Sequence, residues 1–322
     1  MSTDALVAAA LAGDRRALAR LLSLLEGGGP AAAAALRALY PRGGRAHIVG
    51  LTGPAGSGKS TLIAALARQY RERGEPVGVL AIDPTSPYTG GALLGDRVRM
   101  QALAGDAGVF VRSMAVRHGH GGLALAADAA CAALDAAGYT RILLETVGAG
   151  QDEVAVAGVA HTVVVVSAPG LGDEVQALKA GLLEIGDVLV VNKADRPDAE
   201  AAAAALHLLQ ALAPAPPWAP PIVKTCALRG EGIADLVEAI ERHRAFLAAS
   251  DAGGARARQR ARAAALAAAS AELDRRLHAA ASAPCREALW EAVATRARTP
   301  LDAADALVRA VLASPPVEEP SA

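Results

Sequence analysis

The residues with the clearest chemical potential form a glycine-rich loop between a short apolar strand and a helix. Residues 53–60 have the sequence GPAGSGKS, with HIVGL before them and TLIAALARQY after them. Glycines permit a tight turn, so successive backbone N–H groups at the helix start can point at phosphate oxygens. Lys59 is expected to contact the terminal phosphates and Ser60 to bind Mg²⁺. The predicted phosphate-binding residues are Gly53, Pro54, Ala55, Gly56, Ser57, Gly58, Lys59, Ser60 and Thr61.

A chance glycine-rich turn is the alternative, and the composition of the chain argues against it. The basic residues are almost all arginine, and lysine occurs only at Lys59, Lys179, Lys193 and Lys224. A compact ammonium suits a phosphate loop, whereas a guanidinium fork does not. The lysine at position 59 therefore favours a phosphate site.

A second motif distinguishes guanine from adenine. Asn192, Lys193 and Asp195 close the apolar run DVLVV, where a base would lie at the edge of a sheet. Asp195 can accept hydrogen bonds from the guanine N1–H and exocyclic amine, which adenine does not offer, while Lys193 lies along the ring. After the next strand, Cys226, Ala227 and Leu228 can offer a backbone N–H to the guanine oxygen. The alternative is an ordinary turn after a strand.

Three acidic residues are candidates for holding Mg²⁺. Asp83 and Glu145 end apolar strands, and Asp96 follows in a loop, so with Ser60 they form the predicted metal set. Each carboxylate could instead be a helix cap or part of a surface ion pair.

The catalytic prediction combines Lys59, Glu145 and Gln151. Residues 145–148, ETVG, stand where GTPases usually carry Asp-x-x-Gly, whose glycine amide senses the γ-phosphate. Loss of that phosphate would release residues 149–153, in which Gln151 is the candidate for orienting the attacking water. A transition-state arginine could come from a partner or from this chain, where each candidate could equally be a surface residue. These candidates are Arg97, Arg99, Arg112 and Arg117.

The elements that must position these residues alternate between strands and helices. Seven apolar runs rich in β-branched residues are separated by segments of helical length, which predicts an α/β P-loop NTPase fold with a mostly parallel sheet covered on both faces. Ligands bind such sheets at the carboxyl ends of the strands. The predicted strands are 47–53, 77–83, 108–114, 141–146, 161–168, 187–193 and 221–227.

Both ends of the chain are expected to be helical. Residues 4–40 carry apolar residues at helical spacing with a break at 27–30, and an Ala/Arg-rich helix follows a break at 251–254. We therefore predict an N-terminal helical cap at 1–45, a nucleotide-binding domain at 46–250 and a C-terminal helical arm and tail at 251–322. The arm is interpreted either as a solvated appendage or as a self-association element.

Composition narrows the classes of partner. The net charge is −1 and the pI is near 6.7, which argues against a nucleic-acid surface. Three widely spaced cysteines favour a reducing compartment, and no basic n-region precedes an apolar core at the start, so a cytoplasmic protein is expected. The uncharged run 154–172 contains Gly, His, Ser and Pro, so a buried strand is favoured over a membrane span.

Taken together, these motifs resemble the methylmalonyl-CoA mutase-associated GTPases of the MeaB/ArgK type. The resemblance covers about residues 10–245. It rests on DPTSP at 83–87 with TGGALLGDR at 89–97, RSM at 112–114, ETVGAGQ at 145–151, GDEVQALKAG at 172–181 and GDRRALAR at 13–20.

This resemblance implies a GTP-hydrolysing chaperone for an adenosylcobalamin-dependent acyl-CoA mutase, which gates cofactor delivery and protects the mutase from inactivation. It also implies Mg²⁺, a homodimer formed through the C-terminal helices and a nucleotide-responsive segment at 173–187. By the same resemblance Asp83, Asp96 and Glu145 surround the metal, and Asp173, Gln176 and Lys179 respond to the nucleotide.

The chain departs from the family pattern at two places. It has RHGHGG at 117–122 where the family usually has RGHLGG, which shifts the histidine, and Cys226 stands where the last guanine motif usually has serine. The second change should be tolerated, because a backbone amide makes that contact.

Two other functions remain open at this point. A metal-insertion GTPase of the nickel-chaperone kind would need Cys and His ligands, and His118 with His120 is the only close pair. A small-molecule kinase would prefer ATP, which Asp195 opposes.

Overall fold

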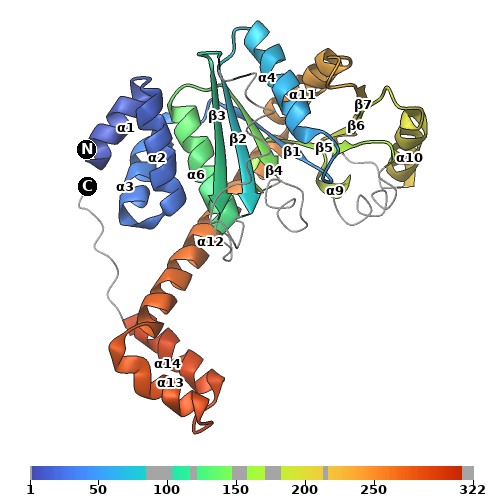
Figure 1. Ribbon diagram of the computed structural model, residues 1–322. Coiled ribbons are helices and arrows are strands. Elements are labelled where there is room, and N and C mark those ends of the chain that lie inside the picture. The colour runs from blue at the N-terminus through green and yellow to red at the C-terminus, as the bar shows by residue number, and fades with distance from the viewer. Residues whose placement is uncertain are drawn as a thin grey trace. The chain divides into compact units, whose positions relative to one another are not determined.

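The computed structural model describes residues 2–84, 103, 105–116, 122–146, 158–170, 183–212 and 217–313 (Figure 1). By its internal contacts the chain forms two compact units. One contains residues 1–118 and 122–264, and the other contains 119–121 and 265–322. The domain boundaries expected near residues 45 and 250 stay predictions.

A seven-stranded sheet forms the centre of the first unit. Its strands lie in the order β3-β2-β4-β1-β5-β6-β7, and every paired neighbour is parallel. This confirms the predicted α/β fold and parallel sheet. The strands are β1 (His47–Thr52), β2 (Val77–Pro84), β3 (Val109–Val116), β4 (Arg141–Thr146), β5 (Thr162–Ser167), β6 (Val188–Asn192) and β7 (Ile222–Thr225).

Alternating side chains of each strand enter two separate cores, one on each face of the sheet. In β6, Val188 and Val190 belong to one core, while Leu189 and Val191 belong to the other. All four side chains are at most 2% exposed. This double burial explains why the strands lack the polar alternation of a half-exposed sheet.

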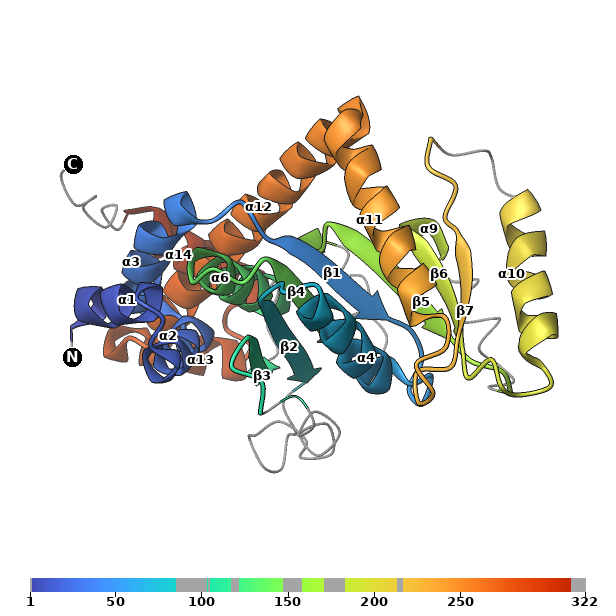
Figure 2. The ribbon, with the colours of Figure 1, turned by 90° about the horizontal axis from the view of Figure 1, so that it is seen from above.

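Helices cover both faces of the sheet (Figure 2). On one face, α4 (Lys59–Glu72) packs beside α11 (Ile233–Ala249), with Leu62, Leu66 and Leu236 fully buried. The other face is covered by α6 (Gly122–Ala136) and by α10 (Ala199–Leu212). Helix α9 (Leu183–Ile185) is a single short turn before β6.

The N-terminal helices pack against α6 and β3, so they belong to the same compact unit as the sheet. They are α1 (Thr3–Leu11), α2 (Arg15–Gly27), α3 (Gly29–Leu39) and the short 3₁₀ turn η1 (Tyr40–Arg42). Asp14 caps α2, because its Oδ1 accepts the N–H groups of Arg16 at 2.8 Å and Ala17 at 3.1 Å. Gly28, with φ 68°, separates α2 from α3, inside the predicted break.

At the amino ends of the strands, a buried polar network joins the sheet to the helices that follow it. The Thr162 hydroxyl lies 2.8 Å from both His47 Nε2 and His243 Nδ1, and His243 Nε2 lies 3.3 Å from Asp187 Oδ1. Asp187 also accepts two hydrogen bonds from Arg256, at 2.7 and 2.8 Å. Because Arg256 belongs to α12 (Asp251–Ala281), this carboxylate ties that helix to the sheet.

The break between α11 and α12 is shorter than predicted. Only Ser250 is extended, with φ −117° and ψ 152°, and residues 251–254 already form the first turn of α12. Gly253 fits there because a Cβ at this position would collide with the carbonyl oxygen of Leu247 in α11. Gly253 therefore allows two consecutive helices to pack closely and does not form a linker, which corrects the expected break at 251–254.

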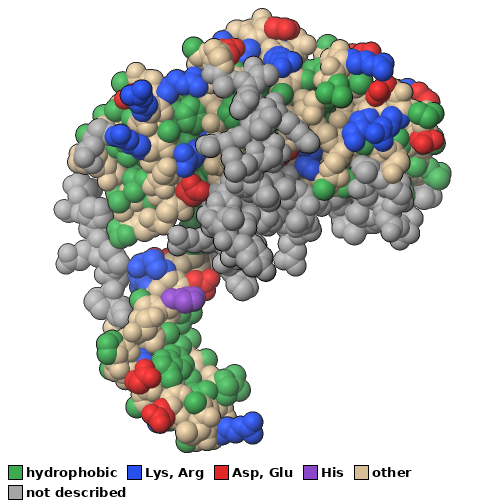
Figure 3. Space-filling model, in the orientation of Figure 1, with side chains coloured by type: hydrophobic (Ala, Val, Ile, Leu, Met, Phe, Trp, Pro, Cys, Tyr) green, Lys and Arg blue, Asp and Glu red, His purple; other side chains and the backbone are tan. Residues whose placement is uncertain are grey.

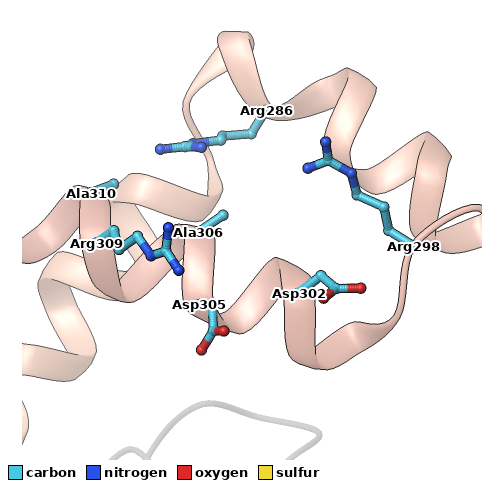
Figure 4. A pocket seen from close by; sticks show the side chains of 7 residues that line it. All are labelled: Arg286, Arg298, Asp302, Asp305, Ala306, Arg309 and Ala310. Carbon is cyan, nitrogen blue, oxygen red and sulfur yellow. The ribbon is translucent and has the colours of Figure 1, made fainter.

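The second unit contains the end of α12, the 3₁₀ turn η4 (Pro284–Arg286), α13 (Glu287–Ala294) and α14 (Pro300–Ala313). Hydrophobic side chains appear on its surface (Figure 3). An open hollow of about 430 Å³ also lies within it, and three guanidinium groups line this hollow together with two carboxylates (Figure 4). They belong to Arg286, Arg298, Arg309, Asp302 and Asp305. Among the described helices, none is both long and apolar enough to cross a membrane.

Candidate functional site

The phosphate loop connects β1 to α4 at the carboxyl edge of the sheet. Gly53, Gly56 and Gly58 have φ values of 136°, 79° and 93°, which side-chain-bearing residues rarely adopt. Gly58 is the N-cap of α4, and no side chain caps this helix end. The first N–H groups of α4, at Lys59, Ser60 and Thr61, are therefore placed for an anion at the positive end of the helix.

At two of these glycines, the surrounding atoms also leave no space for a Cβ atom. A Cβ on Gly53 would collide with the carbonyl oxygen of Val166 in β5, and a Cβ on Gly58 would collide with Nδ2 of Asn192. The loop is therefore held between β5 and the end of β6.

Lys59 lies inside the loop and is 6% exposed. Its Nζ donates to the carbonyl oxygens of Gly53 at 2.6 Å and Pro54 at 3.0 Å. These bonds hold the ammonium over the loop, where it can neutralise phosphate charge.

Ser60 and Glu145 bring two oxygen ligands together. The Ser60 hydroxyl donates to Glu145 Oε1 at 2.6 Å, and both residues are buried. A hydroxyl and a carboxylate side by side at a phosphate loop are the oxygen donors that Mg²⁺ prefers, so these two residues fit that ion.

The other two predicted metal carboxylates cannot be placed as closely. Asp83 is the penultimate residue of β2. Because Ala81 of β2 pairs with Glu145 of β4, the backbone of Asp83 lies at the same carboxyl edge of the sheet. Its side chain, like the whole of Asp96, lies outside the described residues.

Asn192 connects the guanine motif to the phosphate loop. It is 2% exposed, and its Nδ2 donates to the carbonyl oxygen of Ser57 at 2.8 Å. Its Oδ1 accepts the Thr225 hydroxyl at 3.1 Å and the Ala227 N–H at 3.2 Å. One amide therefore joins the ends of β6 and β7 to the loop after β1. The sequence motif at 225–228 was expected to act through its backbone, and the hydrogen bond of the Thr225 hydroxyl to Asn192 was not predicted.

Lys193 makes a second connection to the phosphate loop. Its φ of 58° is left-handed, and its Nζ donates to the carbonyl oxygen of Gly56 at 2.6 Å. The aliphatic stem of Lys193 thus spans from the end of β6 to the phosphate loop, and its position along the base stays a prediction.

Both oxygens of Asp195 have partners at the edge of this pocket. The Cys226 thiol lies 3.4 Å from Oδ1, and Arg229 Nη2 lies 3.4 Å from Oδ2. The hydrogen bond from Cys226, together with the nearby Arg229 charge, holds the pKa of Asp195 below its usual range. Sequence analysis did not identify Arg229, because its spacing matches no motif.

Two of the three backbone N–H groups predicted to bind the guanine oxygen already donate hydrogen bonds within the protein. The Cys226 N–H donates to the carbonyl oxygen of Glu231 at 3.0 Å, and the Ala227 N–H donates to Asn192. Leu228, which follows them, is 89% exposed.

Among the predicted arginines and the water-orienting residue, the structure describes only Arg112, whose guanidinium is bound to residues of α2. Arg112 pairs with Glu26 of α2 at 2.9 Å and also donates to Ser23 and to the Ala19 carbonyl. These contacts fit the alternative interpretation, in which Arg112 is a paired surface residue. The remaining candidates lie outside the described residues: Arg97, Arg99, Arg117, His118, His120, Gln151, Asp173, Gln176 and Lys179.

Comparisons with known proteins agree on one family. The family model described as "Methylmalonyl Co-A mutase-associated GTPase MeaB" matches residues 18–282. The chain is 51% identical over 251 residues to a protein of Pyrococcus abyssi named as a GTPase, with 77% of this chain and 78% of that protein covered. It is 34% identical over 247 residues to the GTPase ArgK of Escherichia coli, with 74% and 75% covered.

Two further similarities are more distant. The mitochondrial methylmalonic aciduria type A homolog of Mus musculus is 36% identical over 210 residues, with 63% of this chain and 50% of that protein covered. A crystal structure of a LAO/AO transport system kinase has a TM-score of 0.68 at 23% identity, with 96% and 97% covered, and this likeness shows the fold alone.

Proposed function

The chain belongs to the MeaB family of methylmalonyl-CoA mutase-associated GTPases, and from this premise we propose that it is a nucleotide-dependent chaperone of an acyl-CoA mutase. In this proposal it binds GTP with Mg²⁺, gates the loading of adenosylcobalamin into the mutase and protects that enzyme from inactivation. It acts as a cytoplasmic homodimer formed through the C-terminal helices and engages neither nucleic acid nor membrane.

The observation that carries the nucleotide part of this proposal is the bridge made by Asn192. Its amide joins the phosphate loop at Ser57 to the segment that carries Asp195 and to the turn at Ala227. This connection supports a single site in which the phosphate loop holds the triphosphate and Asp195 selects guanine. An adenine nucleotide would leave Asp195 without its two donors.

Catalysis in this pocket is mainly positioning and charge stabilisation. The amides of the phosphate loop and the Lys59 ammonium would bind the phosphate oxygens and stabilise the charge that develops on them during hydrolysis. When bound, Mg²⁺ would supply charge neutralisation at the phosphates, and Ser60, Glu145, Asp83 and Asp96 are its proposed ligands. Gln151 is the proposed residue that orients the attacking water.

Base selection tests the nucleotide assignment. Calorimetry with Mg²⁺ should give GTP binding at least a hundredfold tighter than ATP binding. In the Asp195→Asn variant, GTP binding should weaken and xanthosine triphosphate should bind better, because an amide can donate to the second carbonyl of xanthine. A kinase acting on small molecules would be indifferent to this change, and equal binding of ATP and GTP by the natural protein would refute the proposal.

The chaperone part needs a separate experiment. The protein loaded with a non-hydrolysable GTP analogue should co-purify with an adenosylcobalamin-dependent acyl-CoA mutase, and transfer of the cobalamin to the apo-mutase should depend on the nucleotide. The Lys59→Ala variant is the control, because it should lose the dependence on nucleotide. Transfer that proceeds equally with no nucleotide would contradict the gating role.

A further inference from the structure

The guanine-reading carboxylate is held by two side chains of one turn. Cys226 Sγ approaches Oδ1 of Asp195 and Arg229 Nη2 approaches Oδ2, both at 3.4 Å. Asp195 lies in the turn after β6, and its side chain is 32% exposed. Guanine recognition needs both oxygens to face N1–H and the exocyclic amine at the same time. The orientation of this carboxylate therefore decides how well the base is selected.

The partner at Oδ1 is a weak one. A thiol is a poor hydrogen-bond donor compared with a hydroxyl, and a bond from sulfur is long. Cys226 is 3% exposed, and its own N–H is bound to the carbonyl oxygen of Glu231, so the residue is fixed in place. It gives Asp195 a fixed neighbour but only a weak restraint.

Arg229 is placed to provide the missing restraint. Its N–H donates to the Cys226 carbonyl at 3.0 Å, which closes the turn and brings the guanidinium back toward Asp195. On the other side, Glu231 Oε1 lies 3.9 Å from Arg229 Nη1. The guanidinium is thus held between two carboxylates. A carboxylate oxygen has two lone pairs, so Arg229 at Oδ2 leaves one for guanine.

We propose that Arg229 is a positioning residue for guanine recognition, which orients Asp195 and makes up for the weak thiol donor at position 226. This inference rests on GTP recognition by Asp195 but not on the role toward a mutase. It assigns a specificity function to the side chain that follows the guanine motif.

The test is a double-mutant cycle read with three nucleotides. Affinities for GTP, ITP and ATP are measured for the natural protein, Arg229→Ala, Cys226→Ser and the double variant. ITP lacks the exocyclic amine, and ATP offers Asp195 neither donor. Arg229→Ala should weaken GTP binding about threefold to fivefold, the size of an exposed charge contact. It should weaken ITP binding less and leave ATP binding unchanged.

The serine variant makes the test specific. A hydroxyl at position 226 should orient Asp195 without help, so Arg229→Ala should have little effect in the Cys226→Ser background. Arg242→Ala, on the exposed face of α11, is the control and should change none of the three affinities. Thermal unfolding of each variant checks that the turn still folds.

Three outcomes would overturn the inference. They are an unchanged ratio of GTP to ITP affinity in Arg229→Ala, an equal loss for ATP, and the same sensitivity to Arg229→Ala in the serine background. Failure of the natural protein to prefer GTP over ATP would instead refute the nucleotide assignment itself. The two failures are therefore distinguishable.

Discussion

At the scale of single residues, Asn192 connects the phosphate loop to the proposed base-binding segments. Its side-chain nitrogen donates to Ser57 in the phosphate loop, and its side-chain oxygen accepts from Thr225 at the end of β7 and from Ala227 after it. It is buried, so each lost hydrogen bond would leave a polar group without solvent. The phosphate and base parts of the pocket should therefore lose their order together when this amide is removed.

We expect Asn192→Ala to weaken binding of GTP and GDP equally, by about tenfold to a hundredfold. The free energy of unfolding should fall by about 1 to 3 kcal/mol. Fluorescent GTP and GDP titrations with urea unfolding would measure both quantities. Thr225→Val is the matched control, because it removes one of the three bonds and should cost less than half as much affinity. A loss of affinity for GTP alone, with GDP binding unchanged, would contradict this role of Asn192.

Much of this pocket was predictable from sequence because its parts follow from local spacing. The positive φ of Gly56 and Gly58 and the position of Lys59 belong to one continuous motif. The pairing of Ser60 with Glu145 joins residues 85 positions apart and followed only from the rule that strand ends share an edge. The contacts of the Arg229 side chain and of the Thr225 hydroxyl were not predicted, because they depend on how the end of β7 and the turn after it approach β6.

At the scale of elements, Asp187 fixes α12 to the sheet. Its carboxylate accepts from Val163 of β5 at 2.8 Å and from both Nη atoms of Arg256. Its carbonyl oxygen accepts the Trp218 indole N–H at 2.8 Å. The side chains of Asp187 and Arg256 are 11% and 26% exposed, so removing one partner leaves a largely buried charge.

Arg256→Ala should lower the free energy of unfolding by about 2 to 4 kcal/mol. Chemical denaturation would give this value, and hydrogen exchange should show faster opening of the first turns of α12. Arg258→Ala, two residues further along the same helix and exposed, is the control and should change stability by less than about 0.5 kcal/mol. Equal effects of the two substitutions would show that the Asp187 contact contributes nothing.

Two histidines in the same region make stability depend on pH. Burial lowers the pKa of His47 to about 2 and that of His161 to about 3, with smaller contributions from neighbouring charges. His161 Nδ1 accepts the Ile48 N–H at 2.9 Å, which requires the neutral ring. In the unfolded chain both rings titrate near about 6.5, so below that pH the unfolded state binds more protons than the folded state.

Stability should therefore fall as pH decreases from about 6.5 toward about 3. The two histidines together contribute a loss of about 2 to 3 kcal/mol per pH unit. Urea unfolding at about pH 6 and about pH 5, both below the pKa of the unfolded-state rings, measures the slope. His161→Asn keeps an acceptor for Ile48 but does not titrate, so its slope should be shallower. His207→Asn, on the exposed face of α10, should keep the natural slope, and an unchanged slope in His161→Asn would contradict this account.

Strands were easier to predict than helix boundaries. Each of the seven predicted runs overlaps one observed strand, because double burial leaves an uninterrupted β-branched pattern. The start of α12 was placed wrongly because Gly253 and Gly254 suggested a linker. Gly253 is instead required by the approach of the Leu247 carbonyl, a tertiary contact that local sequence does not reveal.

At the scale of the whole molecule, helices α12 and α14 carry exposed apolar side chains. Leu266 and Leu273 of α12 are 59% and 50% exposed, and they are seven residues apart, so they share one face of the helix. In α14, Leu301, Val308 and Leu312 are 76%, 47% and 76% exposed. Such apolar stripes on helices are typical of surfaces that associate.

Charged residues on the α12 face should therefore break the proposed homodimer. We expect the natural protein to be a dimer in light scattering at micromolar concentration, and the Leu266→Lys, Leu273→Lys double variant to be monomeric. Lysine is compatible with a helix, so helical content by circular dichroism should be unchanged. GTP affinity should also be unchanged, because the phosphate loop and Asp195 belong to the other unit.

The control for this double variant is Leu208→Lys in α10. Leu208 is 64% exposed, which is similar to Leu266, but it lies in the sheet-containing unit. It should leave the molecular mass of the natural protein unchanged. If the natural protein is a monomer, or if the double variant remains a dimer, association does not use this face of α12. A monomeric double variant that still binds GTP normally would show that the nucleotide pocket is complete within one chain.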